Sequence, residues 1–185
     1  MQTLTALAAA LALIAAPALA QTGAAPPMAP MGPMAPAAAP SPAAPTTPPG
    51  TVMVKGPQDT ATVTAADLQS MRRYSVTVGW GGGHTYAGAA LSDLLAEVGA
   101  PSEARLHGPP LDQVVIVKGR DGFISVLAIG ETSMTLKGQP VILADQKDGK
   151  PLDDKEGPYR LVIGGELKPP RSVWGVVSIE LRPIK

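Results

Sequence analysis

The sequence contains no cysteine. This absence excludes disulfide bonds, thiolate ligands for a metal ion and a cysteine nucleophile together. Aromatic residues are also scarce, with two Trp, three Tyr and one Phe, which argues against a platform for stacking nucleic-acid bases. Charge is balanced, because 15 Lys and Arg offset 15 Asp and Glu among 185 residues. A neutral chain gives no electrostatic reason to expect nucleic acid or an anionic membrane surface as a partner.

The amino-terminal segment lacks any Lys or Arg before Lys55, so it carries no twin-arginine export signal. An apolar run at 4–16 is too short to span a bilayer comfortably, and residues 18–20 form an A-x-A cleavage site. We therefore predict that residues 1–20 are a secretory signal peptide and that the mature chain is periplasmic or secreted, with no transmembrane segment after cleavage. An uncleaved membrane anchor is the alternative. If the true start codon lies further upstream, a twin-arginine signal is also possible.

Residues 21–50 are rich in Ala and Pro and contain no charged side chain. Proline fixes φ and removes backbone donors, so an extended, polyproline-like tether is predicted. Met28, Met31 and Met34 recur every three residues, which is the repeat of polyproline II, so their thioethers would share one side. Three thioethers suit Cu(I), although low-complexity drift is the simpler interpretation of the spacing.

Residues 51–185 have the size of one ordinary domain, and two short helices are predicted in them. Thr64 can cap a helix at 65–71, because its hydroxyl can accept a hydrogen bond from a first-turn amide. A second helix is indicated at 91–98, where Gly99 supplies the stop. Its apolar residues follow the i, i+3, i+4, i+7 spacing of a buried helical face: Leu91, Leu94, Leu95 and Val98.

Strand patterns dominate the rest of this domain. The Asp121-Gly122 pair is the strongest hairpin signal, because Gly tolerates the positive φ of such turns. The Gly- and Ala-rich stretch 81–90 is predicted to be a loop. The fold class is therefore α+β, with a β-rich mixed sheet and one or two short helices. Strands are predicted at 51–56, 73–80, 113–119, 123–131, 140–146, 159–165 and 172–184, and in the last of them one buried face is predicted for Val173, Val177, Ile179 and Leu181.

The two histidines, His84 and His107, each lack a second ligand nearby in the sequence, so a zinc site has no support. His84 follows three glycines at 81–83, whose amides could form an anion-binding nest. A plain glycine loop is the simpler interpretation. The nucleotide-binding and serine-hydrolase motifs are absent as well.

A cluster of carboxylates precedes the late strands and invites a calcium interpretation. The spacing does not match D-x-D-x-D-G, and lysines are interleaved with the acids, so a solvated turn is the better interpretation. The residues concerned are Asp145, Asp148, Asp153, Asp154 and Glu156.

Arg160 lies within the apolar run 159–163. A buried guanidinium is costly unless it is paired or binds an anion, because it does not lose its proton. Strand alternation places Arg160 on the face opposite Tyr159, Leu161 and Ile163. The pattern alone favours a solvent-facing side chain, and an anion site is the alternative.

Three stretches, taken in order, resemble the molybdopterin-binding domain of the sulfite-oxidase family. They are YAGAALSDLLAEVGAP at 86–101, VVIVKGRDGFISVLAIGE at 114–131, and VILADQKDGKPLDDKEGPYRLVIGGELKPPRSVWGVVSIEL at 141–181. The family shows a short Leu-rich helix, a D-G-aromatic turn between strands, a G.P.R motif and a closing strand. The resemblance implies the fold of that domain.

The resemblance also implies roles for basic residues. Arg160 stands where the arginine of the G.P.R motif helps to bind an anionic substrate near the metal. Lys168 and Arg171 stand where basic residues lie near the pterin. Together with His84, these are the candidate anion- or cofactor-binding residues; neither catalytic residues nor metal ligands are identified.

Two departures from the family bear on the cofactor. The family's enzymes bind molybdenum through one cysteine thiolate, and this chain has none. The cofactor is inserted before export, which then needs the twin-arginine route. We therefore expect a non-catalytic binding or accessory module without molybdenum, whose ligand is a small anion or a periplasmic protein partner. The alternative is a periplasmic oxidoreductase that uses molybdopterin on a small oxyanion.

Overall fold

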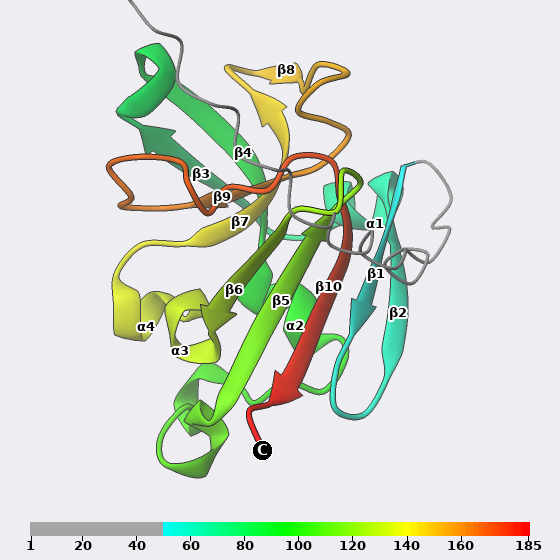
Figure 1. The fold of residues 1–185 in the computed structure, drawn as a ribbon, viewed down its shortest axis with the longest axis vertical. Coiled ribbons are helices and arrows are strands. Elements are labelled where there is room, and N and C mark those ends of the chain that lie inside the picture. Colours follow the sequence, from blue (N-terminus) through cyan, green and yellow to red (C-terminus); the bar gives the residue numbers. More distant parts are fainter. Residues whose placement is uncertain (1–49) are drawn as a thin grey trace, which may run out of the picture. The chain divides into compact units, whose positions relative to one another are not determined.

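The computed structural model describes residues 50–185, which form two β-sheets and a few short helices (Figure 1). The predicted signal peptide, the tether up to residue 49 and the methionines proposed for copper lie outside the described residues. The elements are β1 (Thr51–Lys55), β2 (Thr60–Thr64), α1 (Ala65–Ser70), β3 (Arg73–Val78), the 3-10 turn η1 (Trp80–Gly82), β4 (His84–Ala90), α2 (Leu91–Ala96), the 3-10 turns η2 (Glu103–Arg105) and η3 (Pro109–Leu111), β5 (Gln113–Gly119), β6 (Ile124–Ala128), α3 (Ile129–Thr132), α4 (Met134–Lys137), β7 (Val141–Lys147), β8 (Lys150–Pro151), β9 (Arg160–Ile163) and β10 (Val176–Pro183).

The predicted α+β class is confirmed, although the strands divide between two sheets instead of one. The first sheet has the order β2-β1-β10-β5-β6, and the second has the order β3-β4-β7-β8 with β9 also paired to β7. The first sheet is mixed, because β1 and β10 are parallel while its other three strand pairs, β1–β2, β10–β5 and β5–β6, are antiparallel. The second sheet is antiparallel throughout.

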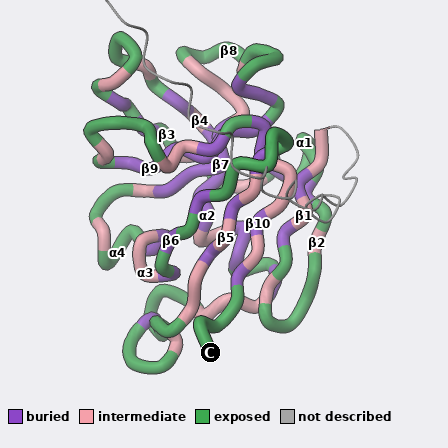
Figure 2. Tube along the Cα trace, viewed as in Figure 1, coloured by how far each residue is buried: buried purple, intermediate pink, exposed green. Residues whose placement is uncertain are grey.

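The main core lies between the inner faces of the two sheets and α2. Val52 and Ile179 contribute from the first sheet, Leu143 and Leu161 from the second, and Leu94 from the helix. All five side chains are at most 1% exposed, and full burial of such a side chain stabilises the fold by roughly 1.5–3 kcal/mol. Figure 2 shows the buried segments of both sheets gathered toward this interior.

The second sheet is buried on its other face too. A smaller cluster there is formed by Val76, Val78, Tyr86, Ile142, Ala144 and Val162. In β9 all four residues are buried, so its two faces belong to different clusters. The strand therefore has no solvent-facing side, and this determines the surroundings of Arg160.

Both predicted helices are confirmed. Thr64 caps α1, with its Oγ1 accepting from the Asp67 amide at 3.3 Å and its own amide donating to the Asp67 carboxylate at 2.9 Å. The structure adds α3 and α4 where a strand was predicted to continue to residue 131. There Glu131 accepts from the Ala128 amide and Ser133 from the Leu136 amide, and these local caps turn the chain out of the sheet. No helix within residues 50–185 is long and apolar enough to cross a membrane.

The loop prediction for 81–90 is wrong from His84 onward, because this segment is β4. Small residues have low strand propensity, but β4 is paired on both sides, with β3 and β7, and tertiary pairing overrides that preference. Close packing explains why residue 88 is glycine, because a Cβ there would lie 2.0 Å from the Leu143 carbonyl oxygen.

The hairpin at Asp121-Gly122 is confirmed, with β5 and β6 antiparallel and Gly122 at φ +84°. The predicted parity of the last strand is partly wrong. A bulge lies between Val176 and Ser178, so Val176 enters the core while Val177 is only half-buried. One extra residue in a strand shifts the side chains before it to the other face.

Replacing Gly88 by Ala should destabilise the domain by about 3 kcal/mol, because the new methyl group meets backbone and not a movable side chain. Gly79→Ala is the matched control, since a Cβ at Gly79 meets nothing within 4 Å. Urea unfolding of the full chain measures both variants. Equal stability of the two would contradict the close approach of β4 and β7.

Candidate functional site

Arg160, the first residue of β9, is the centre of the most densely connected polar site in residues 50–185. Its backbone pairs with Ala144 of β7 and forms a bridge with Trp174. Leu161 and Ile163 point into the main core, so the predicted placement of Arg160 on the opposite face is confirmed. The prediction that this face meets solvent is wrong, because Arg160 is 2% exposed.

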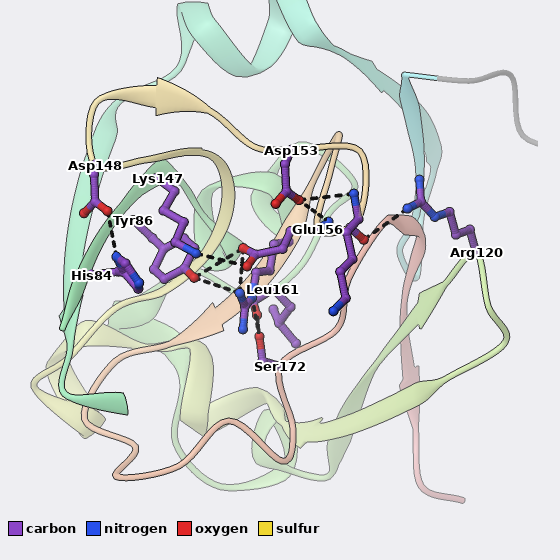
Figure 3. A network of polar contacts seen from close by, with 11 residues as sticks. His84, Tyr86, Arg120, Lys147, Asp148, Asp153, Glu156, Leu161 and Ser172 are labelled. Carbon is purple, nitrogen blue, oxygen red and sulfur yellow. Dashed lines mark hydrogen bonds and ion pairs between the residues drawn. The ribbon is translucent and has the colours of Figure 1, made fainter. Parts of the chain in front are cut away.

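The guanidinium of Arg160 is held by three side chains, Glu156, Tyr86 and Ser172, which Figure 3 labels. Nη1 lies 2.7 Å from the Glu156 carboxylate and donates to the Tyr86 hydroxyl at 2.7 Å. Nε donates to Ser172 Oγ at 2.9 Å, and that hydroxyl donates in turn to the Leu161 carbonyl at 2.6 Å. The cation is therefore paired and oriented by the chain itself.

Aromatic rings complete the surroundings of this cation. The Cζ atom of Arg160 lies 4.9 Å from the ring centroids of Trp80 and Tyr86 and 5.3 Å from that of Trp174. A guanidinium over an aromatic face gains about 0.5–2 kcal/mol, more when it is desolvated. Three of the chain's few aromatic side chains are thus used around one arginine.

Glu156 neutralises Arg160 and also binds Lys147. Its Oε1 lies 3.1 Å from Lys147 Nζ, and Tyr86 donates its hydroxyl proton to Oε2 at 3.3 Å. Burial opposes ionisation and is the largest influence, but the hydrogen bonds from Arg160 and Lys147 together outweigh it and hold the pKa of Glu156 below its ordinary value. The solvated-turn prediction is therefore wrong for Glu156.

The other two groups of the network are affected by the same charges. Burial raises the pKa of the Tyr86 hydroxyl, which outweighs the opposing effect of Arg160, so Tyr86 stays neutral and can donate. Burial lowers the pKa of Lys147, but the contacts with Glu156 and Tyr86 reverse this and leave its pKa raised. Both protonated forms are favoured at neutral pH.

The loop that carries Glu156 is fixed from two sides. Asp153 Oδ1 accepts from the Glu156 amide at 2.8 Å and from the Lys155 amide at 3.1 Å. Arg120, from the β5–β6 turn of the other sheet, donates to the carbonyls of Asp154, Lys155 and Gly157. The two sheets are thereby connected at this loop.

The remaining candidate residues lie apart from the Arg160 network or have partners of their own. Arg171 pairs with Glu131 at 3.0 Å and with Glu166 at 2.7 Å. His84 lies 2.7 Å from Asp148 beside a run of three glycines with positive φ. Lys168 is exposed and makes no ion pair with a described residue. No described contact joins these side chains to Arg160.

Sequence reasoning missed the partners of Arg160. The sequence pattern groups Glu156 with the acids of a solvated turn, and the small residues around Tyr86 predict a loop. The clearest signal available was the arginine itself, because an arginine in an apolar strand requires a counter-charge. The spacing gave no means of choosing Glu156 among five nearby carboxylates.

The network is closed and carries one excess positive charge, since Arg160 and Lys147 together face Glu156. Within residues 50–185, three or more His, Cys, Asp or Glu side chains are nowhere placed to hold a metal ion together. Lys147 keeps 28% of its side chain exposed while Arg160 keeps 3%. The network can therefore attract an anion at its Lys147 edge, but Arg160 is not open to one.

A solved structure of related fold is the sulfane dehydrogenase SoxCD from Paracoccus pantotrophus. The match has a TM-score of 0.53 and 20% sequence identity, and it covers 72% of this chain and 39% of that chain. At this identity the likeness concerns the fold alone, and the chain corresponds to well under half of that protein's length. No family model and no curated protein matches the sequence.

Replacing Glu156 by Gln should destabilise the domain by about 3–5 kcal/mol at neutral pH, because it leaves the buried Arg160 charge uncompensated. Asp154→Asn is the matched control, since Asp154 is an exposed neighbour whose side chain makes no contact with the network. Urea unfolding at pH 7 measures both variants, and similar losses would contradict a buried ion pair.

The cost of Glu156→Gln should depend on pH. The folded-state pKa of Glu156 lies below the ordinary 4.5, so its contribution is fully present above that value and is lost as the pH falls through the folded pKa. The stability difference between wild type and Glu156→Gln should be constant from neutral pH to about 5 and then narrow. A difference that widens on acidification would show that Glu156 is not the ionised partner.

Proposed function

We propose that residues 51–185 form a non-catalytic binding module with the fold of the sulfite-oxidase molybdopterin-binding domain, exported and tethered by residues 21–50. The observation that carries this proposal is the internal pairing of Arg160. The residue that the family resemblance assigns to the anionic substrate is 2% exposed and contacts Glu156 at 2.7 Å. In this proposal, the Glu156 carboxylate takes the place that the resemblance gives to a substrate anion.

The second basic candidate has the same character. Arg171 contacts two carboxylates, Glu131 and Glu166, and burial, the largest influence, is outweighed by these contacts so that its pKa is raised. A cation satisfied by two carboxylates has little affinity left for a pterin phosphate. Two of the basic residues suggested by resemblance are thus used within the chain.

The donor set does not fit molybdenum as the resembled family binds it. That site requires one thiolate, and the sequence has no cysteine. Molybdenum in that family takes a soft, strongly donating ligand, and the carboxylate and hydroxyl groups around Arg160 are hard by comparison. The proposal therefore includes no molybdenum and no redox step.

Of the two ligands considered, a periplasmic protein partner is proposed in preference to a small anion. A small anion would have to displace Glu156 from Arg160 or bind at the partly exposed Lys147 alone. Displacement would leave the buried Glu156 carboxylate without its Arg160 partner, which is costly. A protein partner can bind elsewhere on the surface without opening the network.

A periplasmic oxidoreductase that acts on a small oxyanion is the second candidate, and the fold likeness favours it. The likeness to a sulfane dehydrogenase covers most of this chain. An enzyme would need Arg160 to be released from Glu156 and a metal ligand other than cysteine. Both requirements are additional to what residues 50–185 provide.

If Glu156 occupies an anion site, its removal should create one. Glu156→Ala should be stabilised by added acetate, which can occupy the gap beside Arg160 and Lys147, whereas wild type should not. Thermal unfolding with sodium acetate measures the effect, and sodium chloride at equal ionic strength is the control. Equal responses of wild type and variant to acetate would contradict internal occupancy.

Protein purified from its native compartment should contain substoichiometric molybdenum and no pterin. Elemental analysis and pterin fluorescence after oxidation measure the two components. A molybdopterin enzyme from the same cells is the control for cofactor supply. Stoichiometric molybdenum would overturn the non-catalytic proposal in favour of the oxidoreductase.

A further inference from the structure

β6 is an edge strand whose outer backbone groups are open. It is the last strand of the first sheet, with β5 as its neighbour (Figure 1). The Gly119 amide donates to the Phe123 carbonyl at 2.9 Å, so that pair is hydrogen-bonded. Antiparallel pairs alternate, and therefore the N–H and C=O groups of Ile124 and Val126 point away from β5. Neither residue makes a hydrogen bond in that direction to a described residue.

The open edge is short and has a defined end. The Ala128 amide, which would be the next outward donor, donates to Glu131 at 3.0 Å. Ile124 and Val126 therefore present two donors and two acceptors, enough for two residues of an added strand. An edge of this kind is a template for pairing with another chain.

The side chains at this edge are apolar although they face outward. Ile124 is 51% and Val126 is 50% exposed. On β5 their cross-strand neighbours are Lys118 and Ile116, both half-buried. The opposite edge of the same sheet differs, because the outward residues of β2 are Thr60, Thr62 and Thr64. Protection of the edge by polar side chains is thus present at β2 and absent at β6.

Beside this apolar stripe, the unpaired charges on the outward face of β5 and β10 are positive, while the exposed Asp121 lies in the β5–β6 turn. On β10 the outward Glu180 is already paired with Lys55 at 3.6 Å. Lys118 and Arg182 lie on the same outward face and form no ion pair with a described residue. Arg182 also lines a shallow hollow with Val114, Ile184 and Lys185. The surface therefore complements an apolar strand that carries acidic residues.

We propose that the β6 edge, formed by Ile124 and Val126 with Ile116 and Lys118 beside them, binds an extended apolar and acidic segment of a partner protein by strand addition. The inference rests on the proposed function, because it supplies the partner of a binding module. Main-chain hydrogen bonds would give affinity, and the side chains on one face would give selectivity. A second copy of this chain fits less well, since pairing two β6 edges would bring the same excess of positive charge together.

The probe is a fluorescein-labelled peptide, Thr-Val-Thr-Val-Thr-Glu-Thr, titrated with the full chain by fluorescence anisotropy. Its valines and its glutamate share one face, and antiparallel pairing places the glutamate opposite Ile124, with Lys118 one strand further away on the same face. The same peptide with Lys in place of Glu should bind about tenfold more weakly, because an attraction becomes a repulsion.

Substitutions at the two edges distinguish strand addition from nonspecific binding. Val126→Lys should weaken binding by about tenfold or more, whereas Thr62→Lys, at the equivalent position of the opposite edge, should leave it unchanged. Lys118→Glu should reverse the preference between the two peptides, and it tests the idea without altering β6. On binding, the amide protons of Ile124 and Val126 should become protected from hydrogen exchange.

Failure of the peptide to bind, equal effects of Val126→Lys and Thr62→Lys, or unchanged amide exchange would each overturn the proposal. Sedimentation that shows a dimer lost in Val126→Lys would make a second copy the occupant and overturn the choice of partner. These outcomes are independent of the metal content. Stoichiometric molybdenum would remove the non-catalytic function and leave the edge untouched, whereas peptide failure would leave the metal result unchanged.

Discussion

The ion pair between Arg160 and Glu156 is the interaction on which the surrounding structure depends. A guanidinium at 2% exposure is stable only if its charge is compensated, because desolvation costs several kcal/mol per ion. Compensation requires Glu156 to be held in place, which is achieved by the hydrogen bonds of Asp153 and the clamp of Arg120 on the same loop. The buried charge of Arg160 thus depends on a loop that Asp153 holds and that Arg120 connects to the other sheet.

The same pair is the basis of the binding role proposed for the domain. An arginine in the G.P.R-like position is available to a substrate only while its charge is unsatisfied. Here the carboxylate, the Tyr86 hydroxyl, Ser172 and three aromatic rings surround it. The likeness in fold to a sulfane dehydrogenase is therefore compatible with a different use of the site, in which a residue that could recognise an anion instead stabilises the interior.

The closed interior contrasts with the open edge at β6. Glu156, Tyr86 and Ser172 are paired with Arg160 within the chain, so a partner gains little by approaching them. At β6 the main-chain groups of Ile124 and Val126 have no partner among the described residues, and their side chains are half-exposed. Main-chain groups without a partner in the chain, next to apolar surface, favour association with another chain. Polar groups that are paired within the chain stabilise the fold.

Short-range chemistry along the chain is enough to predict the Thr64 cap, the buried face of α2 and the Asp121-Gly122 turn. Each follows from side chains within a few positions of one another. The strand at His84–Ala90 and the burial of Arg160 depend instead on contacts between distant parts of the chain. Tyr86 lies 74 positions from Arg160, and periodicity carries no information across that separation. The counter-charge was nearer, but choosing Glu156 among its acidic neighbours required the folded loop, because a buried pair is selected by geometry and not by spacing.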